Sequence, residues 1–167
     1  MHDQWHTVKE NIRRWGRELG FDAIGFARAE TGDAPTQLAA WLAAGFHGEM
    51  DYMAAHVSEV GAKRALPTEL VPGTQSIITA RMNYRPVSAD AKETLADTHR
   101  AYLSRYALGR DYHKVMRARL QALAGRMTEA LGEFAHRVFT DSAPVMEVQL
   151  AKQGGLGWRG KHTLLLD

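Results

Sequence analysis

The residues of this chain that are best suited to chemistry lie near its C-terminal end. Asp141 follows the apolar pair Val138 and Phe139, which predicts a short strand, and Pro144 then predicts the first turn of a helix. A carboxylate at the end of a strand can act as a general acid if burial raises its pKa. It can equally cap the helix that follows it. The spacing leaves both roles open for Asp141.

A glycine-rich turn with the sequence GGLGW occupies positions 154–158, and Gly160 and Lys161 follow it. Glycine permits a left-handed backbone or the close approach of a ligand, and a lysine ammonium suits a phosphate or an amide oxygen. The spacing fits neither a dinucleotide-binding GxGxxG turn nor a P-loop. A helix C-cap followed by a turn explains the same glycines. The next predicted strand, 163–166, contains Leu165.

Arg64 lies in a segment, residues 46–75, that has no regular apolar period and contains Pro67, Pro72 and Gly73. Long connections of this kind are often functional. Arginine offers five hydrogen-bond donors in a planar fork, which suits a polar ligand. The alternative is an ordinary surface arginine.

The tripeptide formed by Ser104, Arg105 and Tyr106 comes at the end of a short edge strand predicted for 101–107. A long helix predicted for 111–131 follows it. The donors of these three residues could therefore meet a polar ligand where the strand ends.

The eight histidines show no metal-binding spacing apart from His2 and His6, which are four positions apart without an acidic companion. No metal site is therefore predicted. His113, in the first turn of the long helix, is interpreted as an ordinary surface or core histidine, and Asp111 as the N-cap of that helix.

Apolar periodicity predicts helices that end at Gly20, Gly45 and Gly132, and alternation predicts strands over 22–29 and 77–84. Helices that alternate with strands indicate an α/β or α+β fold. We expect a mixed central sheet of about four or five strands, flanked by helices in three layers, within a single domain over 1–167.

Composition sets broad limits on the class of protein. The 167 residues are 45% hydrophobic and 24% charged, with a net charge of +2 and no cysteine. These values are ordinary for a globular domain, and no apolar run reaches the length of a membrane span or a secretory signal. A cytoplasmic location and no membrane partner are expected. Basic residues gather between positions 100 and 119, either as a solvated helix face or as a phosphate-binding surface.

Several segments occur in an order that resembles the N-terminal part of the epoxyqueuosine reductases, which are oxidoreductases of queuosine biosynthesis that modify tRNA. The segments are FDAIGF (21–26), GFHGEMDYM (45–53), KRALP (63–67) followed by SII (76–78), and RYALGRDYH (105–113). Together they cover nearly the whole chain. The resemblance implies a fold related to the N-terminal domains of cobalamin-dependent reductases, and it implies that Asp141 is the proton donor.

The resemblance also implies a cofactor and partners. Cobalamin, with its cobalt, would contact Asp141 together with Arg64, Ser104, Arg105, Tyr106, Gly160, Lys161 and Leu165. The family uses two 4Fe–4S iron–sulfur clusters, but a chain without cysteine lacks their thiolate ligands, so we expect the ferredoxin-like C-terminal domain to lie outside it. The substrate would be tRNA carrying epoxyqueuosine, and electrons would come from an external donor. We expect a monomer that is inactive by itself. The alternatives are a corrinoid-dependent reductase acting on another small substrate and a non-catalytic module that binds a corrinoid or RNA.

Overall fold

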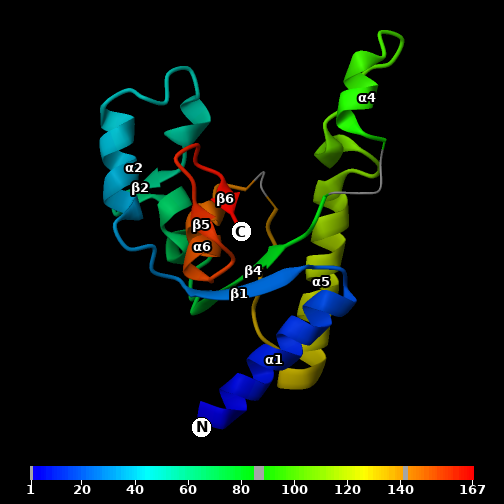
Figure 1. Cartoon of the computed structure of the whole chain (residues 1–167). Coiled ribbons are helices and arrows are strands. Elements are labelled where there is room, and N and C mark those ends of the chain that lie inside the picture. The colour runs from blue at the N-terminus through cyan, green and yellow to red at the C-terminus, as the bar shows by residue number, and fades with distance from the viewer. Residues whose placement is uncertain (1, 85–88, 141–142) are drawn as a thin grey trace. The chain divides into compact units, whose positions relative to one another are not determined.

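The computed structural model describes residues 2–84, 89–140 and 143–167 of the chain. It divides into two compact units (Figure 1). Unit 1 consists of Met1–Asp22 and Met82–Thr140, and unit 2 of Ala23–Arg81 and Asp141–Asp167. Within the described residues, no helix is both long enough and apolar enough to cross a membrane. The single domain expected over 1–167 stays a prediction.

Unit 1 is built on two long helices that pack against each other, α1 and α5. Its helical elements are α1 (His2–Glu18), α4 (Ala91–Ala96), the 3-10 helix η3 (Arg105–Ala107) and α5 (Tyr112–Leu131). Its buried apolar residues are Ile12, Phe21, Leu123 and Ala124. The core of this unit therefore lies between α1 and α5.

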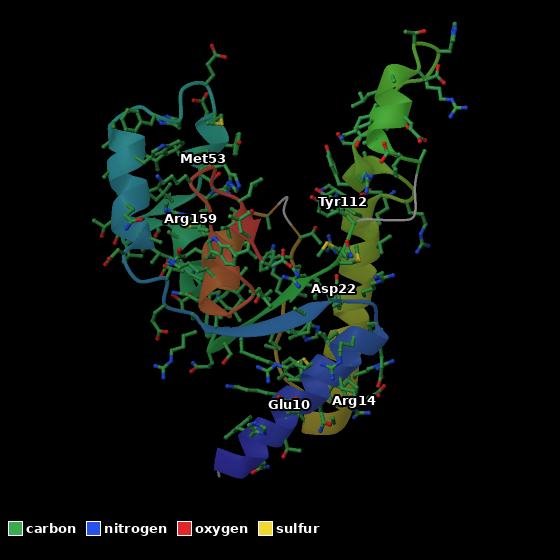
Figure 2. All side chains as sticks on the ribbon, in the orientation of Figure 1. Glu10, Arg14, Asp22, Met53, Tyr112 and Arg159 are labelled. Atoms are coloured by element: carbon green, nitrogen blue, oxygen red, sulfur yellow. The ribbon has the colours of Figure 1, made fainter. Side chains whose placement is uncertain are left out.

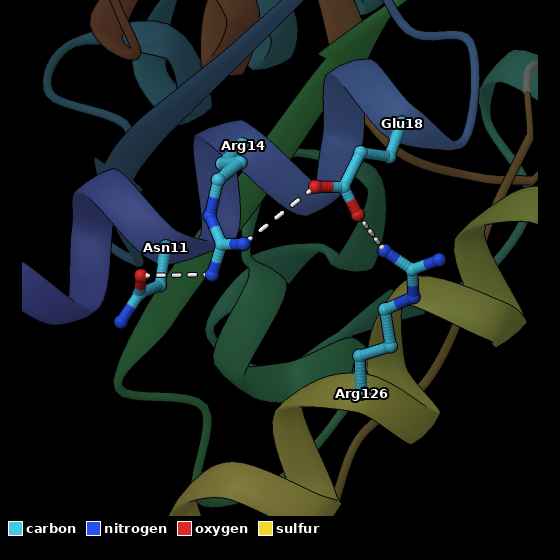
Figure 3. Close-up of polar contacts among 4 residues, drawn as sticks. All are labelled: Asn11, Arg14, Glu18 and Arg126. Atoms are coloured by element: carbon cyan, nitrogen blue, oxygen red, sulfur yellow. Dashed lines mark hydrogen bonds and ion pairs between the residues drawn. The ribbon is translucent and has the colours of Figure 1, made fainter.

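An ion-pair network ties α1 to α5 (Figure 3). The Glu18 carboxylate forms an ion pair with Arg14 on its own helix at 3.7 Å and accepts a hydrogen bond from Arg126 on α5 at 2.5 Å. Arg14 also donates to the Asn11 side-chain oxygen at 3.2 Å. These side chains are about half exposed, so the network adds little stability but fixes which faces of the helices meet.

The end of α1 is fixed by its glycine and by a cation from α5. Gly20 adopts a φ of +83°, which lets the Phe21 N–H donate to the Gly16 carbonyl at 3.0 Å and places Phe21 in the core. Arg119 of α5 donates to the Gly20 carbonyl at 3.0 Å. A guanidinium at this end also complements the negative end of the helix dipole.

Unit 2 is organised around one antiparallel strand pair. Strand β1 (Ala23–Arg28) pairs with β4 (Ser76–Arg81), with Ala23 opposite Arg81 and Arg28 opposite Ser76. The other strands form two short antiparallel pairs, β2 (Val57–Ser58) with β3 (Gly61–Ala62) and β5 (Trp158–Arg159) with β6 (Leu165–Leu166). The helical elements of the unit are α2 (Ala34–Ala43), η1 (Asp51–Met53), η2 (Lys63–Ala65), α3 (Pro67–Leu70) and α6 (Glu147–Gln153).

Helix α6 packs on β1 and β4 through a close approach of two glycines. A Cβ added to Gly154, at the end of α6, would lie 2.7 Å from Thr79 Oγ1 and 3.2 Å from the Phe26 amide nitrogen. A Cβ added to Gly25 would meet the Gly154 carbonyl. The absence of side chains at both positions lets the backbone of α6 lie directly on the sheet.

The structure confirms the α+β class and changes the predicted sheet. Among the described residues, the strands form three separate pairs instead of one mixed sheet of four or five strands. The edge strand predicted for 101–107 is wrong: the segment is irregular and ends in η3, where the Ala107 N–H bonds the Ser104 carbonyl at 2.9 Å. Local turn bonds of this kind use the groups that a strand would need for its ladder.

The strand predicted at Val138 and Phe139 is also wrong, because residues 132–140 have no regular structure. Pro144 precedes its helix instead of lying in the first turn. The Val145 N–H donates to the Ala143 carbonyl at 2.8 Å, which closes a tight turn around the proline before α6 begins at Glu147.

Candidate functional site

Arg64 lies in η2 of unit 2, where its guanidinium faces an aromatic ring. The guanidinium carbon is 5.9 Å from the centre of the Tyr52 ring, and the arginine is half-buried. Tyr52 is 61% exposed. A cation over an aromatic face is held loosely at an exposed site, so Arg64 keeps its hydrogen-bond donors for a ligand.

The backbone next to Arg64 is anchored in the core of unit 2. Ala65 is completely buried, and its carbonyl accepts a hydrogen bond of 2.5 Å from the buried hydroxyl of Thr31. This bond joins η2 to the loop between β1 and α2. Because η2 is fixed at Ala65, the base of the Arg64 side chain has a defined position.

Gly160, Lys161 and Leu165 come together in one hairpin, formed by β5 and β6. The Gly160 N–H donates to the Leu164 carbonyl at 2.9 Å, and the Thr163 N–H donates to the Gly160 carbonyl at 3.0 Å. Leu165 lies opposite Arg159 in the strand pair, and Lys161 is exposed in the turn. Figure 2 labels Arg159 on β5. The hairpin thus presents cationic side chains beside a tightly bonded backbone.

The hairpin turn holds an uncommon backbone conformation. Thr163 has a φ of +70°, which is rare for a β-branched residue. The His162 ring accepts from the Leu164 N–H at 3.1 Å and covers Gly160, where an added Cβ would lie 2.6 Å from the ring. Strain of this kind persists only where surrounding contacts hold it, and such positions cluster at ligand sites.

Arg81 attaches the hairpin to the sheet, a role that was not predicted from the sequence. Its guanidinium lies 2.5 Å from the Asp167 carboxylate and 3.4 Å from the Leu156 carbonyl. The residues involved are far apart in the chain, so no local spacing could have revealed the contact. Arg81 at the end of β4 therefore positions the two ends of the segment that contains Gly160.

Ser104, Arg105 and Tyr106 lie in unit 1, at the start of η3. Ser104 precedes η3 without using its side chain as a cap, and it is exposed. The Tyr106 ring meets the Tyr112 ring edge-on, with centroids 6.1 Å apart. Tyr112 lies at the start of α5 (Figure 2). The predicted contact residues are therefore joined to the first turn of α5 by aromatic packing.

Asp111 caps α5 as predicted, and it has a second role that was not predicted. Its carboxylate oxygen accepts from the His113 backbone N–H at 3.0 Å and lies 3.0 Å from the His113 ring nitrogen Nδ1. The His113 side chain lowers the pKa of Asp111 below its usual value. The sequence analysis expected an ordinary surface or core histidine at position 113 and did not predict its contact with the Asp111 carboxylate.

The predicted site residues thus form groups within separate units. Arg64 and the hairpin lie in unit 2, and the tripeptide that begins at Ser104 lies in unit 1. Asp141 lies outside the described residues. In the part of the chain that the structure describes, no cluster of three or more histidine, cysteine or acidic side chains could hold a metal ion.

Comparison with known proteins shows which proteins this chain resembles. The family model described as "Epoxyqueuosine reductase QueG, DUF1730" matches residues 64–142. An epoxyqueuosine reductase from Pseudomonas aeruginosa is 53% identical over 96% of this chain, and one from Alicycliphilus denitrificans is 57% identical over 93%. The relatives of this chain are epoxyqueuosine reductases. The chain covers 43% and 44% of these two proteins, less than half of their length.

Solved structures of epoxyqueuosine reductases share the fold. A selenomethionine-labelled crystal structure matches with a TM-score of 0.74 over 96% of this chain and 41% of that one, at 22% identity. A structure of an epoxyqueuosine reductase with an epoxyqueuosine-modified tRNA-Tyr stem loop matches with a TM-score of 0.73, also at 22% identity, over 96% of this chain and 41% of that one. These structures confirm the fold that the resemblance implied, and the sequence relatives confirm the resemblance itself.

Proposed function

We propose that this chain is the cobalamin-binding N-terminal part of an enzyme that reduces epoxyqueuosine to queuosine in tRNA. The observation that carries the proposal is the identity of about half of all residues with epoxyqueuosine reductases over nearly the whole chain. A tRNA substrate is supported by the structural neighbour that binds a modified tRNA stem loop. The rest of a longer protein would supply the electrons.

The donors of the described residues fit a corrin. The rim of a corrin carries amide groups, whose oxygens accept hydrogen bonds. Arg64 and Lys161 of unit 2 offer a guanidinium and an ammonium, and in the described structure neither side chain makes an ion pair. We propose that these two groups, with the backbone of Gly160 and Leu165 in the same unit, contact cobalamin. The contacts expected for Ser104, Arg105 and Tyr106, which lie in unit 1, stay predictions. Iron–sulfur clusters do not fit this chain, because it has no cysteine.

The overall reaction fixes what the protein must do. Reducing an epoxide to an alkene and water consumes two electrons and two protons. Cobalamin, when bound, supplies the low-valent cobalt that makes cleavage of the carbon–oxygen bonds accessible. The polypeptide must bind and orient the ligand, exclude water and deliver the protons.

We propose that Asp141 delivers one proton to the epoxide oxygen. A general acid in this position contributes about 10²–10⁴-fold to the rate. A structural neighbour from Bacillus subtilis is described as having an aspartate-bearing catalytic loop swung out of the active site, which supports an acidic residue in this role. Monomeric state and cytoplasmic location stay predictions.

The test uses the full-length reductase that contains this chain. We expect Asp141→Asn to lower turnover of epoxyqueuosine tRNA by about 10²–10⁴-fold while cob(II)alamin still binds, as followed by visible absorption. Arg64→Ala should weaken cobalamin binding, and Arg28→Ala, an exposed arginine of the same unit, should not. Normal turnover in Asp141→Asn would remove the proton-donor role.

The substrate is tested separately. Nucleosides from the treated tRNA are analysed by mass spectrometry for loss of one oxygen atom from epoxyqueuosine. Reduction that does not require tRNA would favour another small substrate. Cobalamin binding without any reduction would favour a non-catalytic module.

A further inference from the structure

The hairpin formed by β5 and β6 has little support of its own. Each of its strands is two residues long, and two further backbone bonds close the turn, from the Gly160 N–H to the Leu164 carbonyl and from the Thr163 N–H to the Gly160 carbonyl. Trp158 and Leu164 are mostly exposed. Since a two-stranded hairpin is only marginally stable by itself in water, its position depends on contacts with the rest of unit 2.

The guanidinium of Arg81 makes polar contacts between the sheet and both ends of the hairpin. One nitrogen, Nη1, lies 2.5 Å from Asp167 Oδ2 and donates to the Leu156 carbonyl at 3.4 Å. Leu156 is buried and precedes β5 by two residues, and Asp167 directly follows β6. A single atom at the end of β4 therefore joins the two ends of the hairpin. We call these contacts of Arg81 with Asp167 and Leu156 the Arg81 bridge.

The two ends of the hairpin also lie close to each other where the Arg81 bridge holds them. Gly157 has a φ of +154°, and a Cβ added to it would meet the Leu166 carbonyl. Only a glycine lets the backbones of the two ends approach in this way. Because the ends are packed together, a displacement of one end also displaces the other. The Arg81 bridge therefore acts on the hairpin as a whole.

The hairpin residues that are proposed to contact cobalamin are Gly160, Lys161 and Leu165, which lie between these two ends. A ligand binds more weakly when its contacts must first be ordered, because part of the binding free energy is then used to order them. We propose that Arg81 is a positioning residue, which holds the hairpin in the position that binds cobalamin by bridging its two ends. This inference rests on the proposed function.

The exposure of the ion pair sets the size of the expected effect. The side chains of Arg81 and Asp167 are 34% and 63% exposed. Ion pairs at such positions change an equilibrium constant by up to about fivefold, and they weaken at high salt because dissolved ions screen the charges. The Arg81 bridge is therefore strong enough to shift the population of a marginally stable hairpin, but it is too weak to hold the fold of unit 2 by itself.

The first experiment follows the hairpin without cobalamin and without turnover. Backbone hydrogen exchange is measured by mass spectrometry in the full-length reductase that contains this chain, on peptides covering 156–167 and, as an internal reference, 23–28. We expect Arg81→Gln to accelerate exchange in 156–167 by about two- to fivefold and to leave 23–28 unchanged. High salt should accelerate exchange in 156–167 of the unmodified protein more than in Arg81→Gln. Equal exchange in 156–167 of both proteins would overturn the inference.

The second experiment measures the affinity of the same protein for cob(II)alamin by visible absorption. We expect Arg81→Gln and Asp167→Asn each to raise the Kd by about two- to fivefold. The double variant should raise it little more than either change alone, because both changes break the same ion pair. Arg126→Gln is the matched control, because Arg126 forms an ion pair of the same length, 2.5 Å, with Glu18 in unit 1. Arg126→Gln should leave the Kd and the exchange in 156–167 unchanged.

The outcomes distinguish this inference from the proposed function. If the unmodified reductase shows no saturable binding of cob(II)alamin, the proposed cobalamin role fails, and the positioning role fails with it. An unchanged Kd in Arg81→Gln, although exchange in 156–167 has accelerated, overturns the positioning role alone. A Kd that rises in Arg81→Gln but not in Asp167→Asn would mean that the guanidinium contacts cobalamin directly, which also overturns the positioning role.

Discussion

The contact between Gly25 and Gly154 gives the sharpest test of how this fold positions its C-terminal hairpin. Gly25→Ala would place a methyl group against the Gly154 carbonyl and 2.7 Å from Thr79 Oγ1. The second distance is about 0.7 Å short of the 3.4 Å at which ordinary contact begins. Because one obstacle is backbone, α6 must move away from β1 to make room.

The expected cost follows from overpacking. Forcing an extra carbon into a filled space costs about 1–3 kcal/mol. Replacing glycine by alanine also restricts the backbone of the unfolded chain, which by itself raises the free energy of unfolding by about 0.4–1 kcal/mol. We therefore expect Gly25→Ala to lower the free energy of unfolding by about 1–2 kcal/mol. Helix α6 leads into the hairpin that contains Gly160, so the proposed cobalamin affinity should fall as well.

The assay is urea unfolding of the 167-residue chain, followed by circular dichroism. Gly125→Ala is the matched control, because Gly125 lies within α5 and an added Cβ meets nothing within 4 Å. We expect Gly125→Ala to raise the free energy of unfolding by up to about 1 kcal/mol. Glycine-to-alanine substitution should therefore lower the free energy of unfolding at position 25 and raise it at position 125.

A double-mutant cycle separates side-chain from backbone obstruction. The nearest obstacle to Gly154→Ala is the Thr79 hydroxyl, so Thr79→Ala should recover much of the stability lost in Gly154→Ala. The same change should recover less in Gly25→Ala, where the backbone obstacle remains. Full stability in Gly25→Ala, or equal rescue of both variants, would refute the reasoning.

Two further predictions concern unit 1. Glu18→Gln removes the carboxylate shared by Arg14 and Arg126. Because these side chains are about half exposed, we expect the free energy of unfolding to fall by less than about 1 kcal/mol, and by less still at high salt. Urea unfolding at two salt concentrations measures this difference. The lowered pKa of Asp111 stabilises the folded chain above the unfolded carboxyl pKa of about 3.9, and this stabilisation is lost as the pH falls through the lower folded pKa. In acid titrations followed by circular dichroism, the difference between the unmodified chain and Asp111→Asn should vanish in strong acid; a difference that persists there would contradict this assignment.

Local signals in the sequence predicted the long helices and the two longest strands, β1 and β4, but two shorter predicted strands were wrong. Gly20 and Gly132 end α1 and α5 as expected, and Asp111 begins α5, because caps are set by neighbouring residues. The strands over 101–107 and at Val138 were wrong, because a strand exists only where a distant partner completes its hydrogen bonds. Such partners cannot be inferred from periodicity.

The same division applies to the candidate site. The sequence predicted a glycine-rich turn before a strand over 163–166, and the structure adds that Gly160, Lys161 and Leu165 lie in one hairpin. Contacts between distant segments were missed, such as Arg81 with Asp167 and Arg64 with Tyr52. The Asp111–His113 pair was missed although it is local, since an aspartate that caps a helix often does nothing more.

The β1–β4 pair also has a consequence for how the chain is made. Its two strands are complete once Arg81 has been synthesised, but α6, which packs on both of them, begins only at Glu147. At ~5–20 residues per second, these roughly 66 residues take about 3 to 13 s to emerge. During that interval the glycine-bearing face of β1 is open to water without its helix. Packing of α6 on β1 and β4 ends that exposure.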